Sequence, residues 1–215
     1  MSVQPLAALR RLQSRTEQPR KQLPRPGERC EMCGEAVADE HSHVAKLDQH
    51  RRLLCVCRPC YLLFTHGGAA SGRYRAVPDR YLRIPGFALS SAQWDRLQIP
   101  VDLAFFFQQS DLNSWVACYP SPGGATESLL ELEIWTHMAA ANPALADLTP
   151  DVEAVLVRRS GADFECFRAP IDACYQLVGL VRMHWQGLHG GAEVWRRIDG
   201  FFDELRRRSG GRAGG

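Results

Sequence analysis

Apolar residues that recur every three or four positions predict three long helices in the second half of the chain. The stripes are Leu130, Ile134, Met138 and Ala141; Ile171, Cys174, Leu177, Val178, Val181 and Trp185; and Val194, Ile198, Phe201, Phe202 and Leu205. Thr126 is a candidate N-cap for the first helix, and a shorter helix over 90–97 begins with a Ser-x-x-Gln capping box. Each stripe predicts a helix with one face packed on a core.

Apolar runs between these helices predict strands, and the strands fall into two similar halves. Segment 100–110 parallels segment 150–160 at equal length, and each continues after a turn into a Cys-aromatic sequence at Cys118 and Cys166. Each strand pair is followed by a helix. We therefore expect residues 81–208 to form an α+β domain of two ββα units, an antiparallel sheet with helices on one face.

The first third of the chain has a different pattern, in which a predicted β-hairpin between residues 43 and 56 is flanked by cysteine pairs. Cys30 and Cys33 form one C-x2-C pair, and Cys57 and Cys60 form the second. Two such turns can bring four thiolates together around one ion in a tetrahedral shell. The order of knuckle, hairpin and helix resembles a treble-clef or zinc-ribbon module.

The identity of the metal is less constrained than its ligands. Four cysteines in C-x2-C pairs suit a structural zinc ion, and they also suit a rubredoxin-type iron. A disulfide framework is disfavoured, because residues 1–29 carry seven Arg or Lys and no apolar signal segment, which indicates a reducing, cytoplasmic location. Zinc is the preferred interpretation. A closed four-thiolate shell would make it structural rather than catalytic.

Four further soft ligands lie in the same stretch of sequence. Cys55 would face the same side of a strand as Cys57, so it is an alternative ligand, although a small core residue is the commoner role for such a cysteine. His41, His43 and His50 are expected to be solvated hairpin residues, since four thiolates already complete the shell.

The length of 215 residues and the composition of the chain predict one domain of ordinary size and a small module. Residues 1–28 are polar and basic and residues 209–215 are glycine-rich, so both are expected to be disordered tails. The zinc-binding module is expected over 29–66 and a linker over 67–80. No apolar run approaches the length of a membrane span.

The net charge is only +2, and it is unevenly distributed. Residues 97–157 contain no Lys or Arg but eight acidic residues, and these would repel a phosphate backbone. Nucleic-acid binding is therefore an unfavoured alternative. The glycine-bearing loop over 120–128 lacks the lysine of a phosphate loop and is interpreted as a turn and helix cap. No catalytic residue is predicted, which favours a protein that is not an enzyme.

A set of motifs carries a family resemblance that covers residues 28–205. They are CEMCGE, RRLLC-x-C-RPC-x-LLF, GRYRAVPDR, AFFF, YPSPGGATESLLELE, PIDACYQLVGLVR-x-HW-x-GLHGG and VW-x-x-IDGFF. Together they resemble an uncharacterised bacterial family encoded beside high-affinity nickel–iron uptake hydrogenases. The resemblance implies a zinc-containing accessory protein that binds a hydrogenase subunit or maturation factor. A rubredoxin-like electron-transfer partner and a treble-clef nucleic-acid-binding protein are the alternatives.

Overall fold

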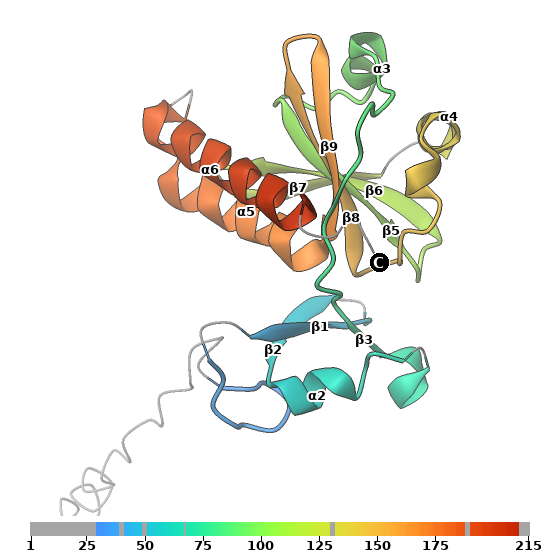
Figure 1. Cartoon of the computed structure of the whole chain (residues 1–215), viewed down its shortest axis with the longest axis vertical. Helices are drawn as coiled ribbons and strands as arrows, with labels where there is room; N and C mark the ends of the chain where they lie inside the picture. Colours follow the sequence, from blue (N-terminus) through green and yellow to red (C-terminus); the bar gives the residue numbers. More distant parts are fainter. Residues whose placement is uncertain are drawn as a thin grey trace, which may run out of the picture.

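The computed structural model describes residues 29–38, 41–48, 51–66, 68–129, 132–187 and 190–210. The expected basic tail over 1–28 lies outside this part of the chain, as do residues 211–215, His50 and Leu130. In Figure 1 the described chain forms a lower body that ends near residue 76 and an upper body built on a sheet.

The lower body is a four-cysteine module built on a small antiparallel sheet. Strands β1 (Ser42–Lys46) and β2 (Arg52–Val56) form the predicted hairpin, and β2 leads through Cys57 into α2 (Arg58–Leu62). Pro59 lies in the first turn of α2, where no backbone N–H is required. Strand β3 (Tyr74–Ala76), preceded by the 3-10 turn η1 (Ala69–Gly72), pairs with β1. Part of the segment expected to be a linker therefore belongs to the module's sheet.

The upper body contains one six-stranded antiparallel sheet in the order β4-β9-β8-β5-β6-β7. Its strands are β4 (Leu82–Arg83), β5 (Leu103–Gln109), β6 (Ser114–Ser121), β7 (Gly124–Leu129), β8 (Glu153–Ser160) and β9 (Asp163–Pro170). The predicted hairpins are present as β5–β6, with Phe105 opposite Cys118, and β8–β9, with Val157 opposite Cys166. A mixed helix and antiparallel-sheet fold is thus confirmed.

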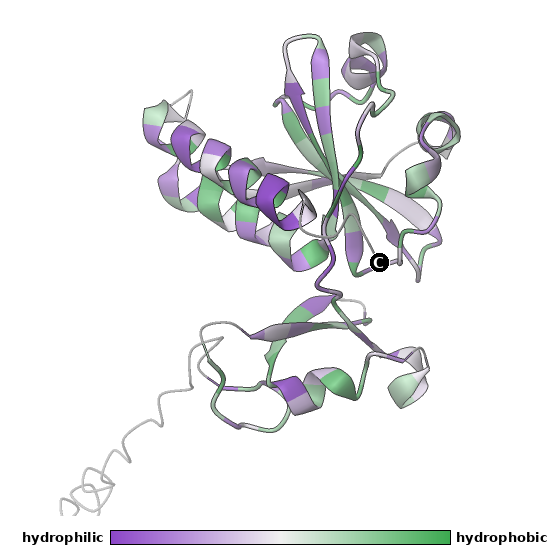
Figure 2. Ribbon diagram, in the orientation of Figure 1, coloured by the Kyte–Doolittle hydropathy of each residue, from purple (hydrophilic) through white to green (hydrophobic). Residues whose placement is uncertain are grey.

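Helices cover both faces of this sheet, so the expectation that they lie on one face is wrong. On one face α5 (Ile171–His184) and α6 (Gly191–Gly210) pack against Phe105, Phe107 and their neighbours. On the other face α3 (Ser91–Arg96), α4 (Leu132–Ala141) and the 3-10 turn η2 (Pro143–Leu145) pack against Phe106 and its neighbours. Figure 1 shows the two helix pairs on opposite sides, and Figure 2 shows hydrophobic residues concentrated in the strands between them.

The first repeat unit also differs from the prediction. Residues 124–129 form β7, which pairs with β6 so that Ser121 lies opposite Gly124, and α4 begins only at Leu132. Thr126 is therefore a strand residue and not an N-cap. Gly124 has φ +123°, a backbone conformation that L side chains rarely adopt, which explains why glycine follows the hairpin turn.

Other helix predictions are confirmed. Ser90 caps α3 in a reciprocal capping box with Gln93, and α6 buries Val194, Ile198, Phe202 and Leu205 as its stripe predicts. Helix α6 extends through Ser209 to Gly210, two residues into the segment expected to be a disordered tail. None of the helices in the described ranges is both long and apolar enough to cross a membrane.

The two bodies share a packed junction. Ala45 and Val77 are buried in the same apolar cluster as α5 and α6, with Leu47 and Leu53 packed against it. Polar contacts add to this junction, because His43 lies 2.8 Å from Asp172 of α5 and Arg75 donates to the Pro150 carbonyl at 2.7 Å. The hairpin therefore has two packed faces, one toward the cysteine pairs and one toward the α+β domain.

Candidate metal centre

The structure brings the sulfur atoms of Cys30, Cys33, Cys57 and Cys60 within 4.8 Å of one another. The Cys33 and Cys57 sulfurs are 3.6 Å apart. Tetrahedral zinc with Zn–S bonds of about 2.3 Å places its ligand sulfurs about 3.8 Å apart, so this separation fits one shared ion. The four cysteines could therefore hold a metal ion.

Local backbone structure explains how the first pair reaches this position. The Gly34 N–H donates to the Cys30 carbonyl at 2.8 Å, and the Cys30 N–H donates to the Glu35 carbonyl at 2.7 Å, which closes the knuckle. Gly34 has φ +79°, a left-handed conformation suited to glycine. Glu31 fixes the knuckle to the hairpin, because its N–H donates to the Cys55 carbonyl and its carboxylate accepts from the Cys55 N–H at 2.6 Å.

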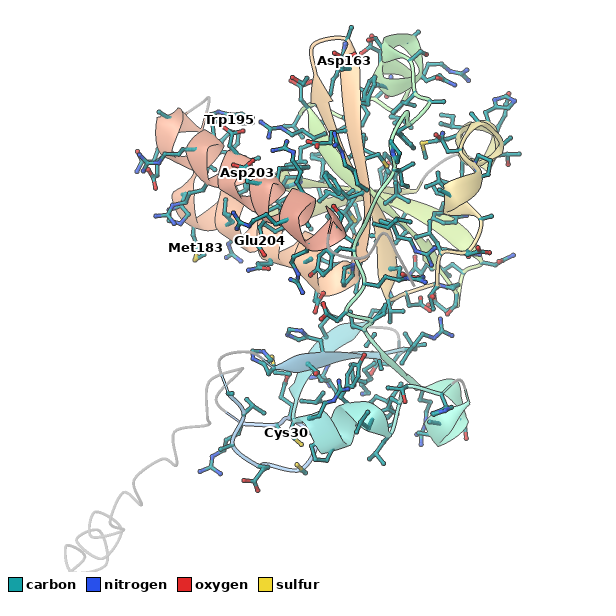
Figure 3. The ribbon with its side chains drawn as sticks, in the orientation of Figure 1. Cys30, Asp163, Met183, Trp195, Asp203 and Glu204 are labelled. Atoms are coloured by element: carbon teal, nitrogen blue, oxygen red, sulfur yellow. The ribbon has the colours of Figure 1, made fainter. Side chains whose placement is uncertain are left out.

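The second pair is positioned by the end of β2 and the start of α2. Cys57 has extended backbone angles at the N-cap of α2, and Cys60 is buried in the first turn of that helix. Cys30 and Cys60 pack in one buried apolar cluster with Val44, Leu54 and Val56. Figure 3 labels Cys30 beside α2, on the side of the module away from the six-stranded sheet.

The electrostatics of the cluster favour a bound cation. Burial raises the pKa of the Cys30 thiol, but backbone N–H groups of Cys57, Cys33 and Met32 outweigh it and lower the pKa from 9.0 to about 6. For Cys60, burial and the neighbouring sulfurs raise the pKa well above its usual value. Four adjacent thiolates repel one another, so a cation is the natural way to keep all four deprotonated.

Cys55 does not join this group, contrary to the alternative that places it beside Cys57. Strand β2 ends at Val56, so the side-to-side alternation of a strand does not continue to Cys57. Cys55 lies instead with His41 and His43, and one ligand atom from each of the three is within 4.8 Å of the others. The expectation that His43 is a solvated hairpin residue is also wrong, because its ring contacts Asp172 at the junction.

Sequence reasoning missed this second group, because its members meet only through the register of the hairpin. His43 lies directly opposite Cys55 in the β1–β2 register, and both alternate with Val44, Leu54 and Val56 of the module core. The group borders a cleft of about 880 Å³. Residues from both bodies line the cleft, including Leu53, Arg58, Tyr81, Asp172, Tyr175 and Arg208.

Basic residues of β3 and of the segment after it form ion pairs within the molecule. Arg75 pairs with Asp151, which lies just before β8, and Arg80 pairs with Glu153, the first residue of β8. Arg83 lies 3.4 Å from Glu165 of β9. These side chains neutralise acidic groups of the chain itself, which lowers their availability to a phosphate backbone.

The fold and the site together define a class: an α+β protein that carries a four-cysteine module able to hold a metal ion. The chain belongs to the family of unknown function DUF5947, whose model matches residues 29–209. The match spans the four cysteines and nearly all of the α+β domain. No curated protein and no solved structure matches the chain.

Proposed function

We propose that this protein is a non-enzymatic accessory protein whose four cysteines hold a structural zinc ion and which acts by binding another protein. The observation that carries the zinc assignment is the convergence of four sulfur atoms within 4.8 Å. Four thiolates fill the coordination shell of a tetrahedral zinc ion, so the ion would stabilise the module rather than bind substrate. We assign the module to the treble-clef type on its order of knuckle, hairpin and helix.

Exposed apolar side chains beside the metal centre support the protein-binding role. Leu62 and Leu63, which follow Cys60 by two and three residues, are 51% and 64% exposed at the end of α2. Adjacent exposed leucines in a small module cost solvation free energy unless a partner covers them. Zinc would fix the start of α2 and hence the position of both leucines.

The proposed partner is a subunit or maturation factor of a nickel–iron uptake hydrogenase. This assignment rests on the resemblance carried by the motifs of the sequence, from CEMCGE to VW-x-x-IDGFF. The protein would then contribute to assembly or operation of the hydrogenase in the cytoplasm.

An iron-containing electron-transfer protein is the second candidate. Cys33 is exposed, whereas Cys30 and Cys60 are buried, so one edge of the metal centre reaches the surface. An accessible thiolate edge is what electron transfer to a docked partner would require. The two candidates differ in colour, because ferric iron bound by four thiolates absorbs visible light and zinc does not.

Affinity capture from a cell that makes the hydrogenase tests the accessory role. The wild type is expected to recover a hydrogenase subunit or maturation factor, and the double variant Leu62→Asp, Leu63→Asp is expected to lose it. Leu112→Asp is the matched control, since Leu112 is 59% exposed on the α+β domain. The proposal fails if no such partner is recovered and deletion of the gene leaves hydrogenase processing and activity unchanged.

A further inference from the structure

His41, His43 and Cys55 form a compact group of metal-ligating side chains on the opposite face of the hairpin from the four cysteines. One ligand atom from each lies within 4.8 Å of the other two. We propose that this group is a second cation site, which takes a divalent ion of the zinc class and lies at the junction between the module and the α+β domain. The site is separate from the four-cysteine centre and goes beyond the accessory function.

The β1–β2 hairpin explains why the three side chains converge. His43 and Cys55 are directly opposite each other in the antiparallel register, where Cβ atoms are about 4.5–5.5 Å apart. His41 precedes β1 by one residue and is two residues from His43, which places it on the same side of extended chain. The His41 and His43 rings meet edge to face, with their centroids 4.8 Å apart.

Both histidines have a second partner that orients the ring. Nδ1 of His43 lies 2.8 Å from Oδ2 of Asp172, and Nδ1 of His41 lies 3.3 Å from the Ala38 carbonyl oxygen. Metal-binding histidines commonly donate one ring N–H to a carboxylate or a carbonyl, which leaves the other nitrogen for the ion. The structure provides one partner of each kind, and in the proposed site the ion would bind each ring through Nε2.

The chemistry of the ligand set selects the kind of ion. Two imidazoles and one thiolate are borderline-soft ligands, which favour zinc and its transition-metal neighbours over magnesium or calcium. Three protein ligands leave a fourth coordination position for water or another donor. The adjoining cleft of about 880 Å³, lined by His41, His43 and Asp172, gives that position access to solvent. An ion held here would therefore exchange more readily than one enclosed by four thiolates.

The site also links the two bodies of the molecule. His41, His43 and Cys55 belong to the four-cysteine module, whereas Asp172 lies in the first turn of α5. An ion bound to His43 would strengthen the His43–Asp172 hydrogen bond, since the ion makes the imidazole N–H a stronger donor. Occupancy would in this way stabilise the junction.

Cobalt titration of the zinc-loaded full chain tests the proposal. The protein is first dialysed against a mild chelator, its retained zinc is measured, and Co²⁺ is then added. Cobalt is expected to bind in one additional equivalent, with visible bands of four-coordinate cobalt and a thiolate-to-cobalt charge-transfer band. Zinc in the four-cysteine centre should remain bound, because zinc outcompetes cobalt at a thiolate site.

Three variants and one control define the ligands. Cys55→Ser should abolish the charge-transfer band, His41→Gln should weaken cobalt binding, and Asp172→Asn should weaken it by about 10-fold or more. His137→Ala is the matched control, because His137 is exposed on α4 and should leave binding unchanged. Three results would each overturn the proposal: no additional cobalt bound by the wild type, zinc release that matches cobalt uptake, or full binding in folded Cys55→Ser.

Discussion

Replacement of Glu153 by glutamine should destabilise the protein more than any exposed charge substitution. Glu153 is 1% exposed at the start of β8 and accepts hydrogen bonds from Arg168 of β9 on both carboxylate oxygens. Arg80 and the Thr149 N–H also donate to it, and Arg168 is itself only 4% exposed. Removing the negative charge would leave the Arg168 guanidinium buried without its counter-ion, the situation in which a broken ion pair is most costly.

The pKa of Glu153 sets the magnitude and the pH dependence. Burial alone would raise this pKa, but hydrogen bonds from Arg168, Thr149 and Arg80 lower it from 4.5 to about 2. Because folding lowers this pKa, the ionised carboxylate stabilises the native state at pH values above the pKa of the unfolded state. The stabilisation is about 3 kcal/mol at neutral pH. This contribution is lost as the pH falls from about 4.5 to about 2, at about 1.4 kcal/mol per pH unit.

Urea unfolding of wild type and Glu153→Gln from pH 7 to pH 3 checks this reasoning. The free-energy difference should be about 3 kcal/mol at pH 7 and should shrink toward pH 3, because the carboxylate becomes protonated in the unfolded state below about pH 4.5 but stays ionised in the folded state until about pH 2. Glu193→Gln is the matched control, because Glu193 pairs with Arg196 and Arg197 on the solvent side of α6 and should change stability little. A difference that is absent, or that does not change with pH, would refute the assignment.

Two further predictions concern glycines and buried thiols. Gly190→Ala should destabilise the protein by roughly 1–3 kcal/mol in urea unfolding, because Gly190 has φ +84° and a Cβ there would lie 2.8 Å from a Val194 methyl group. Gly200→Ala, in open space on α6, should instead stabilise it by about 0.5–1 kcal/mol, and the same sign for both changes would contradict the packing described. Cys118 and Cys166 should resist iodoacetamide in the native state, since burial raises the pKa of Cys118 to about 12 and that of Cys166 well above its usual value; mass spectrometry that finds either residue modified as fast as in urea would show that they are accessible.

The sequence predicted those parts of the fold whose signals are local. The capping box of α3 and the stripes of α5 and α6 depend on residues three or four positions apart, so each is visible without tertiary structure. The predicted start of the first helix is too early, because Gly123 and Gly124 are typical of a loop before a helix as well as of a hairpin turn. Their role as a hairpin turn becomes clear only when β7 pairs with β6.

Coverage of both sheet faces has a sequence signal in β5. Residues 103–107 of β5 are all buried, with Phe105 and Phe107 toward α5 and Phe106 toward the opposite face. A strand with only one buried face alternates apolar and polar residues, whereas a continuous apolar run indicates two covered faces. The run AFFF therefore indicates helices on both faces of the sheet, which the prediction of one covered face does not take into account.

The two groups of metal-ligating side chains differ in how far each can be predicted from local sequence. The C-x2-C spacing of the four cysteines is a local pattern, and the structure brings all four together. The group of His41, His43 and Cys55 depends on strand alternation, on the hairpin register and on Asp172, which is 129 residues from His43. No single stretch of sequence contains that information.

Metal analysis of the purified protein after mild chelation tests the central claim most directly. The wild type and Cys55→Ser should each retain about one zinc ion per chain, and Cys30→Ser and Cys60→Ser should lose it together with folding of the module. A wild type without metal, a ferric thiolate spectrum, or full zinc retention by Cys60→Ser would contradict a structural zinc ion held by the four cysteines.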